Sequence, residues 1–387
     1  MKPFVLLIMI LGIILSAFGC TAAPSGQTSP TNAATTAEPT THPTQTEETP
    51  QITIQQLPMT AISLPVITDA QAAEDGTVVF CQTYQNISLT LPDATVADKI
   101  ILDFLNRTDI HKQAQLTKEE AIEMYNSGVT PLPLWEKILY APQRIDQSVI
   151  SLYGNHATYT GGAHGSFSCK AVTYDLLTGD PLTLGNIVTD DTSADLICQL
   201  ICDALEPDRQ ELYLFEDYRD TVENLLSGNI RGYADWYLSN IGLCFFFSPY
   251  EIGPYASGDI VAEIPYNRLT GILRDAYFPA ENETVAGSVV IEPFDKADLS
   301  RYNQIAEVTL DDGGKRYVIH TDTKVDNIRI IQEAPYFADP SMMDSYTVFG
   351  AGYLTPGDAI VLQIPEAGNV RITYTTADGE FTQTIEN

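Results

Sequence analysis

The sequence predicts an α+β fold whose main part is an antiparallel sheet with helices packed on one face. Segments that alternate apolar and polar residues are grouped together, and so are segments with apolar residues at helical spacing. A smaller α+β region is expected before this part, and an all-β, sandwich-like C-terminal domain after it. The 387 residues are enough for two or three domains that each bury a core.

The amino terminus predicts an exported, lipid-anchored protein. One lysine precedes an apolar run from Phe4 to Leu15, and small residues lead to Cys20, with Ala17 in place of the usual branched aliphatic residue. Residues 1–19 are therefore predicted to be a lipoprotein signal peptide. Cys20 would be the lipidated first residue, on the extracellular face of the cell membrane. Residues 20–50, rich in Thr and Pro, are predicted to be a disordered tether.

Residues 51–145 are predicted to form the smaller α+β region. Strand-like segments run from Gln51 to Pro92, and a helix follows Asp93 because apolar residues then recur every three or four positions. A second helix is predicted from Thr117 to Gly128, with Glu120 completing a capping box.

Residues 146–278 are predicted to form the main domain. Two helices are expected in its middle, where apolar residues recur at helical spacing, and a third near its end. The predicted elements are the strands Ser148–Thr160 and Ser166–Leu176, a helix after Asp190, a helix over Tyr218–Leu226, the strands Trp236–Ser239, Gly242–Ser248 and Asp259–Ile264, and a last helix through Leu269 and Leu273.

A glycine-rich turn, Tyr159-Thr160-Gly161-Gly162-Ala163-His164-Gly165, joins the first two of these strands. Because glycine readily adopts positive φ, we expect Gly161 and Gly162 to make a tight turn that holds Tyr159 and His164 at the rim of the sheet. These four residues are candidates for ligand binding. A purely structural hairpin is the alternative, because glycine-rich turns between strands are common.

A second candidate site is the loop from Ser248 to Gly258. Its proline and glycine residues hold Tyr250 and Tyr255 in a connection rather than in a strand. Both tyrosines are therefore predicted to contact a protein or carbohydrate ligand. The alternative is that they belong to the core, as aromatic residues near strands usually do.

Two runs of sequence resemble a known family. They are Tyr159-Thr160-Gly161-Gly162-Ala163-His164 and Phe245-Phe246-Phe247-Ser248-Pro249-Tyr250-Glu251-Ile252. Both are similar to the RsiV-like extracellular domain, a domain of unknown function that occurs with an N-terminal companion in a lysozyme-sensing anti-sigma factor and in a peptidoglycan deacetylase. The resemblance covers residues 146–275 and, more loosely, 55–145. It implies a lysozyme as one extracellular ligand, whereas the deacetylase and sigma-binding parts have no counterpart in this sequence.

The tail, residues 285–387, lies outside the resemblance. Short alternating segments follow one another there, with turn residues between them, which is typical of a β-sandwich. The predicted strands are Ile305–Leu310, Tyr317–His320, Val325–Ile331, Ala359–Ile364, Val370–Thr375 and Phe381–Ile385.

The charge of the chain limits its partners. There are 51 Asp and Glu against 20 Lys and Arg, a net charge of -31. This argues against nucleic acid, and against an anionic membrane surface bound through basic residues, so the membrane is contacted through the lipid anchor only. A cationic protein would be attracted. The alternative is that the acidity only keeps an exported protein soluble.

No motif for catalysis, a metal or a cofactor is found. The sequence contains no His-Glu-x-x-His helix, no paired Cys-x-x-Cys and no Gly-x-Ser-x-Gly elbow. His156 and His164 could approach each other across the hairpin, but two histidines without placed carboxylates are weak support for a metal. The pairing of five cysteines stays open, although Cys169 and Cys244 could be neighbours; the five are Cys81, Cys169, Cys198, Cys202 and Cys244.

These observations favour a non-enzymatic cell-surface lipoprotein that binds an extracellular protein, such as a cationic lysozyme, or a cell-wall glycan. The alternative is an enzyme that acts on peptidoglycan, or an accessory subunit of one. Two carboxylates about 5 to 9 Å apart in a cleft beside the glycine-rich turn would favour the enzyme.

Overall fold

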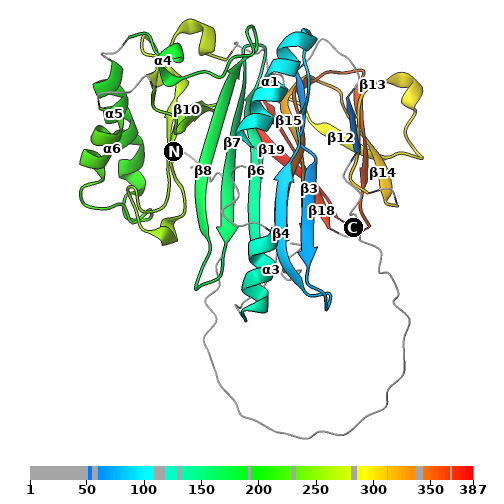
Figure 1. The fold of residues 1–387 in the computed structure, drawn as a ribbon. Coiled ribbons are helices and arrows are strands. Elements are labelled where there is room, and N and C mark those ends of the chain that lie inside the picture. The colour runs from blue at the N-terminus through cyan, green and yellow to red at the C-terminus, as the bar shows by residue number, and fades with distance from the viewer. Residues whose placement is uncertain are drawn as a thin grey trace, which may run out of the picture. The chain divides into compact units, whose positions relative to one another are not determined.

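The computed structural model of the protein describes residues 51–54, 60–108, 118–128, 133–190, 193–227, 232–279, 286–311, 313–335, 343–366 and 368–386 (Figure 1). The predicted signal peptide, Cys20 and the tether lie outside these residues. None of the helices in the described ranges has the length and apolar character needed to cross a bilayer.

The central sheet contains five strands. Its core strand is β6 (Leu134–Ile145), in which buried and half-buried residues alternate as the pattern of the sequence requires. β6 pairs antiparallel with β7 (Val149–Tyr159), and β7 pairs antiparallel with β8 (Ser166–Asp175). On the other side of β6 lie β4 (Val78–Gln85), which runs parallel to it, and β3 (Val66–Ala72), antiparallel to β4.

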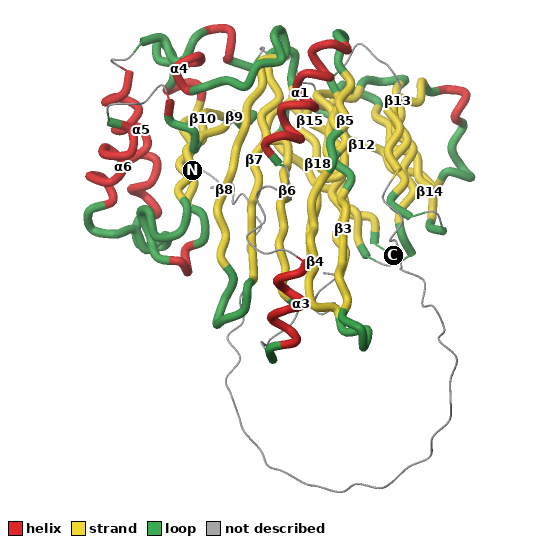
Figure 2. Tube along the Cα trace, viewed as in Figure 1, coloured by secondary structure: helices red, strands yellow, loops and turns green. Residues whose placement is uncertain are grey.

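Two helices of the first region, α1 and α3, pack against this sheet (Figure 2). α1 (Ala94–Arg107) begins at Asp93, whose side chain accepts a hydrogen bond from the Thr95 amide at 2.9 Å, as the predicted helix start requires. It buries Ile100 and Phe104 in a core shared with the central sheet. α3 spans Lys118–Asn126.

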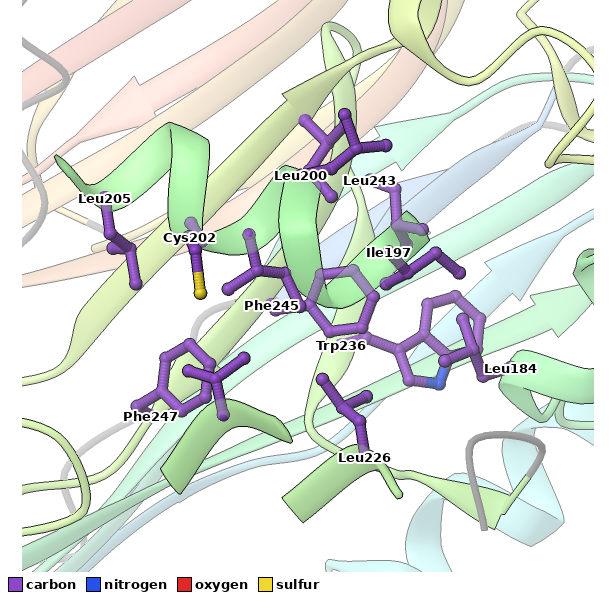
Figure 3. Packing of buried hydrophobic residues seen from close by; sticks show 14 of the residues in the cluster. Leu184, Ile197, Leu200, Cys202, Leu205, Leu226, Trp236, Leu243, Phe245 and Phe247 are labelled. Atoms are coloured by element: carbon purple, nitrogen blue, oxygen red, sulfur yellow. The ribbon is translucent and has the colours of Figure 1, made fainter. Parts of the chain in front are cut away.

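A smaller sheet carries the helices of the main domain. Its strands are β9 (Trp236–Leu238), β10 (Gly242–Phe247) and β11 (Ile260–Pro265), all antiparallel. Two helices, α5 (Ser193–Leu205) and α6 (Tyr218–Leu226), pack on one face, and the short α4 (Leu184–Ile187) lies beside them. Figure 3 shows Leu226, Trp236 and Phe245 in this packed core.

β10 is buried on both faces, which explains its unbroken apolar sequence. Leu243, Phe245 and Phe247 face the helical core, whereas Cys244 and Phe246 pack with residues of β7 and β8. Because successive side chains of a strand point to opposite faces, a strand between two layers has no polar positions. The three-phenylalanine run therefore joins the helical layer to the central sheet.

The C-terminal region is an all-β sandwich, as predicted. One sheet has the order β1-β13-β17-β14-β12 and the other the order β19-β18-β15-β16-β2-β5. Their strands are β1 (Gln51–Ile54), β2 (Ala61–Ser63), β5 (Ser88–Thr90), β12 (Val289–Pro293), β13 (Asn303–Thr309), β14 (Lys315–Thr321), β15 (Val325–Pro335), β16 (Met343–Leu354), β17 (Asp358–Ile364), β18 (Asn369–Thr376) and β19 (Gly379–Ile385).

Sheet pairing crosses the predicted domain boundaries. The sandwich takes three strands, β1, β2 and β5, from residues 51–145, and the central sheet joins β6 to β7 across residue 145. β1 pairs with β13, so the first described residues lie about 250 positions from their partners. Local patterns indicate strands but do not indicate which distant strand they will pair with.

The α+β class is confirmed, but one local prediction is wrong and the strand β16 was missed. No helix runs through Leu269 and Leu273. The chain forms a 3₁₀ turn over Tyr266–Arg268, and Gly271 then adopts a φ of 80°, which ends any helical path. The strand β16 was not predicted, because Gly350 and Gly352 interrupt its alternating pattern.

These two glycines let β16 lie close to the end of β6. A methyl group on Gly350 would be 3.0 Å from the side chain of Ile145 and 3.2 Å from that of Pro142. On Gly352 it would be 3.1 Å from the Ile145 carbonyl oxygen. Glycine is therefore needed here for close packing of the sandwich on the central sheet.

We expect Gly350→Ala to lower the free energy of unfolding by about 1 to 3 kcal/mol, because the added methyl group overpacks this contact. Gly313→Ala is the matched control, since its methyl group would meet only an Asp311 oxygen at 3.5 Å. Denaturant unfolding of both variants measures the difference. Equal stability of the two variants would contradict this account of the contact.

Candidate functional site

The glycine-rich turn has the backbone geometry that the sequence predicts. β7 and β8 pair up to Thr158 and Ser166, and the turn closes between them. Gly161 has a φ of 88° and Gly162 a φ of 134°, values that residues with a side chain rarely adopt. The turn is exposed at its tip, where residues 162–164 are all accessible.

The side chain of Tyr159 stabilises this turn. Its hydroxyl donates a hydrogen bond to the Gly162 carbonyl oxygen at 2.9 Å, and its ring stacks on Trp135 with 6.2 Å between ring centroids. The hydrogen bond closes the turn, and the ring contact joins the end of β7 to the neighbouring strand β6. The geometry therefore gives Tyr159 a structural task in the turn.

Tyr255 joins the two segments that the sequence singled out separately. Its hydroxyl donates to the Gly165 carbonyl oxygen at 2.8 Å, and its ring lies 4.6 Å from the His164 ring and 5.9 Å from the Tyr250 ring. The half-buried Phe167 meets the same ring edge-on at 5.6 Å. The turn and the loop 248–258 thus form one continuous row of aromatic rings.

The loop 248–258 is held rigidly enough to present this row. Ile252 is fully buried, and a 3₁₀ turn over Tyr255–Ser257 follows Pro254. The carboxylate of Glu251 accepts a hydrogen bond from the Ser248 amide at 2.6 Å, and burial raises the pKa of that carboxyl. The buried side chain of Ile252 and these backbone contacts therefore hold the loop that carries Tyr250 and Tyr255.

A neighbouring loop adds two aromatic residues that sequence reasoning missed, Tyr213 and Phe215. The Phe215 amide donates to the Ile252 carbonyl oxygen at 2.9 Å, and the Ser257 hydroxyl donates to the Leu212 carbonyl oxygen at 2.7 Å. These bonds hold the loop 209–215 beside the loop 248–258. We define the aromatic surface by its five members, His164, Tyr213, Phe215, Tyr250 and Tyr255.

Two members of the aromatic surface have strained backbones. Tyr213 has a φ of 51° and Tyr250 a φ of 72°, and among described non-glycine residues only Asn327 shares a positive φ. Both tyrosines are also exposed, to 69% and 64%. Strain at a bulky, exposed residue is uncommon, and it concentrates at sites that contact ligands.

Acidic residues flank the aromatic surface. The segment 206–217 carries five carboxylates that are exposed or nearly so, and one arginine. The acidic residues are Glu206, Asp208, Glu211, Glu216 and Asp217. Glu206 forms an ion pair with Arg219 and accepts a hydrogen bond from the Tyr218 hydroxyl. The segment 206–217 still carries a net negative charge.

Sequence comparison matches the part of the chain that carries most of the aromatic surface to a known family. Residues 186–267 match the family described as "Protein of unknown function (DUF3298)". The chain contains a DUF3298 domain. No curated protein matches the chain. The RsiV-like assignment and the N-terminal companion stay predictions.

Two solved structures of DUF3298 family proteins are similar to this chain. One, from Bacteroides fragilis NCTC 9343, is 18% identical, with a TM-score of 0.42, and the match covers 56% of this chain and 94% of the other. The second, from Pseudomonas aeruginosa PAO1, is 16% identical, with a TM-score of 0.39, and the match covers 57% and 97%.

The DUF3298 domain supplies Tyr213, Phe215, Tyr250 and Tyr255, whereas the glycine-rich turn precedes it. The aromatic surface is thus completed by His164 from outside the matched residues. A local sequence signal for Tyr213 is absent, because its importance comes from its backbone conformation and from the hydrogen bonds that Leu212 and Phe215, on either side of it, make to residues more than 30 positions away.

The two histidines of the hairpin have separate partners. His156 Nε2 lies 2.7 Å from the buried Glu136 carboxylate, and His164 Nδ1 lies 2.7 Å from the Gly165 carbonyl oxygen. Within the described residues, no cluster of three or more His, Cys, Asp or Glu side chains is arranged to hold a metal ion.

Cys169 and Cys244 are neighbours, as their positions on strands of one domain indicated. Both are buried in one cluster with Tyr237 and Phe246, and both are thiols. Burial raises the pKa of each thiol above its usual range, which makes the reactive thiolate scarce. These cysteines therefore act as core residues in this structure.

We expect Gly162→Val to lower the free energy of unfolding by about 1 to 3 kcal/mol through backbone strain alone. A side chain at Gly162 would meet no atom within 4 Å, so crowding contributes nothing. Ala163→Val, at the next exposed position and without positive φ, should be nearly neutral. Thermal and chemical unfolding of both variants would show the difference, and equal stabilities would contradict the role of φ at Gly162.

Proposed function

We propose that this protein is a non-enzymatic, membrane-tethered lipoprotein that binds an extracellular cationic protein through the aromatic surface. The observation that carries the proposal is the pair of strained, exposed tyrosines, Tyr213 and Tyr250, on two loops bonded to each other. Tyrosine is enriched at protein interfaces because one side chain supplies a large apolar area and a polar tip.

The backbone strain at Tyr213 and Tyr250 supports a role in binding rather than in stability. A non-glycine residue in the left-handed region costs about 1 to 2 kcal/mol, which glycine would avoid. Neither Tyr213 nor Tyr250 offsets that cost by burying its ring, since about two thirds of each is accessible. A ligand that covers the rings supplies the missing stabilisation.

The negative charge of the chain favours a cationic protein over the cell wall as the ligand. The chain has a net charge of -31, and carboxylates flank the aromatic surface. A cationic protein, such as a lysozyme, is steered toward such a surface, whereas an anionic wall polymer is repelled. Wall glycan is the second ligand to test.

Two carboxylates near the turn have structural partners, which supports binding over catalysis, although Glu251 also interacts electrostatically with Asp235, and burial raises the pKa of the Glu251 and Asp235 carboxyls. Near the turn, Glu251 accepts a backbone hydrogen bond from Ser248, and Asp259 accepts a hydrogen bond from the hydroxyl of the half-buried Tyr153. Each carboxylate thus holds a loop or strand in place. A glycosidase would instead need two carboxylates facing each other across a substrate cleft.

Replacing the strained tyrosines separates binding from folding. Tyr213→Gly and Tyr250→Gly remove the ring and relieve the positive φ, so we expect unchanged or higher stability, by up to about 1 kcal/mol. Affinity for lysozyme should fall at least about tenfold, as expected for the loss of an aromatic anchor. Leu177→Ala, at a side chain that is 85% exposed elsewhere, is the control.

Binding is measured on the chain from Thr49 onward, which forms one compact unit, at low and high salt. Association should slow as salt rises, because screening weakens steering. Unchanged affinity in both glycine variants would move binding away from the aromatic surface. Retention of the protein by purified peptidoglycan, and not by lysozyme, would favour the glycan ligand.

Lipid anchoring rests on Cys20, and its replacement is the second test. Cys20→Ser removes the thiol that would carry the lipid, so we expect an unprocessed or released protein without label after growth with a radioactive fatty acid. Cys244→Ser is the control, because Cys244 is fully buried in the folded part. Persistence of the label in the Cys20→Ser protein would exclude this anchor.

A further inference from the structure

An open surface pocket of about 510 Å³, which shares no residue with the aromatic surface, lies where the turn after β8 approaches α4 and the segment 274–277. Its volume is within the range that holds small molecules in proteins. Side chains of both charges line it, together with the apolar side chain of Leu182 and the ring of Tyr277; the charged ones are Asp175, Asp180 and Arg274.

The acidic wall is fixed by the turn itself. Asp175 Oδ1 accepts hydrogen bonds from the Leu177 amide at 2.7 Å and the Thr178 amide at 3.1 Å. Its second oxygen, Oδ2, is 3.5 Å from the Tyr277 hydroxyl, a long contact that leaves it available as an acceptor. Asp180 forms an exposed ion pair with Lys99, which solvent screens.

Arg274 and Asn186 bring hydrogen-bond donors to the same pocket. Arg274 donates from Nε to the Val188 carbonyl oxygen at 2.9 Å, which fixes the guanidinium plane while its two terminal nitrogens keep their N–H groups. Asn186 accepts two hydrogen bonds through Oδ1 from Thr183, each at 2.7 Å. Its Nδ2 amide therefore remains as a donor.

We propose that this pocket binds an α-amino acid or short peptide as a zwitterion, with its carboxylate at Arg274 and Asn186 and its ammonium at Asp175 and Asp180. A simple anion would meet two carboxylates, and a metal cation would meet a guanidinium. Only a ligand with both charges satisfies both sets of side chains. Leu182 and Tyr277 supply the apolar contact for a side chain.

The test uses the full-length protein and five probes: L-alanine, D-alanine, L-alanyl-L-alanine, propionate and L-alaninamide. The last two each lack one charge of the zwitterion. We expect at least one zwitterion to bind by calorimetry and to raise the melting temperature, with at least a tenfold weaker response to propionate and to L-alaninamide. Equal responses to the zwitterions and to the two singly charged probes would overturn the proposal. So would the lack of a response to any zwitterion.

Asn186→Asp is the most informative variant. It keeps the Oδ1 acceptor that caps Thr183 and exchanges the Nδ2 donor for a second oxygen, so the fold should survive while a ligand carboxylate is repelled. Zwitterion affinity should fall at least tenfold. Asp195→Asn, an exposed change on α5, should leave it unchanged.

Asp180→Asn tests the acidic wall with little risk to folding, because this side chain is largely exposed. Affinity for the zwitterions should fall, while the response to propionate should hold or rise. Variants with an unchanged melting temperature and unchanged zwitterion affinity would exclude this pocket as the site. The aromatic surface shares no residue with the pocket, so either proposal can fail alone.

Discussion

The buried guanidinium of Arg144, at the end of β6, is the interaction on which the arrangement of the layers depends. Its side chain is 1% exposed, and it contacts Asp146, the Tyr266 hydroxyl at 2.7 Å and the Tyr277 carbonyl oxygen at 2.6 Å. Tyr266 in turn donates to Ser239 beside β9. A buried cation is tolerated only where such partners surround it, so Arg144 holds the central sheet, the small sheet and the segment 274–277 in one arrangement.

The strand β6 also contacts the sandwich, and its pairing with β7 crosses residue 145. β6 bonds to β4 and β7 through its backbone, while Lys137 on it forms a largely buried ion pair with Asp344 of β16 at 2.7 Å. The Gln85 amide donates to the Thr347 carbonyl oxygen nearby. Residues more than 200 positions apart thus depend on each other for burial and for hydrogen bonds, and separating them would leave polar groups unpaired.

What the sequence could predict follows from the range of the interactions involved. The turn at Gly161 and Gly162 and the helix start at Asp93 are local, and both were predicted because a glycine φ or a capping side chain acts within a few residues. The pairing of β2 with β16 was not, since any exposed strand edge would satisfy the local pattern. Tyr213 was missed for a related reason: its conformation is imposed by a loop that folds against another loop.

The excess of acidic over basic residues links the fold to its proposed ligand. Several arginine and lysine side chains pair with carboxylates, and those of Arg144, Lys137 and Arg371 do so in half-buried or buried positions. With 51 acidic and 20 basic residues, most carboxylates have no such partner available and must remain hydrated at the surface. Their field acts over about a Debye length of 8 to 10 Å, beyond the reach of any single contact. In the proposed function, such a surface would guide a cationic protein to the strained tyrosines, which would supply the contact area that charge alone cannot provide.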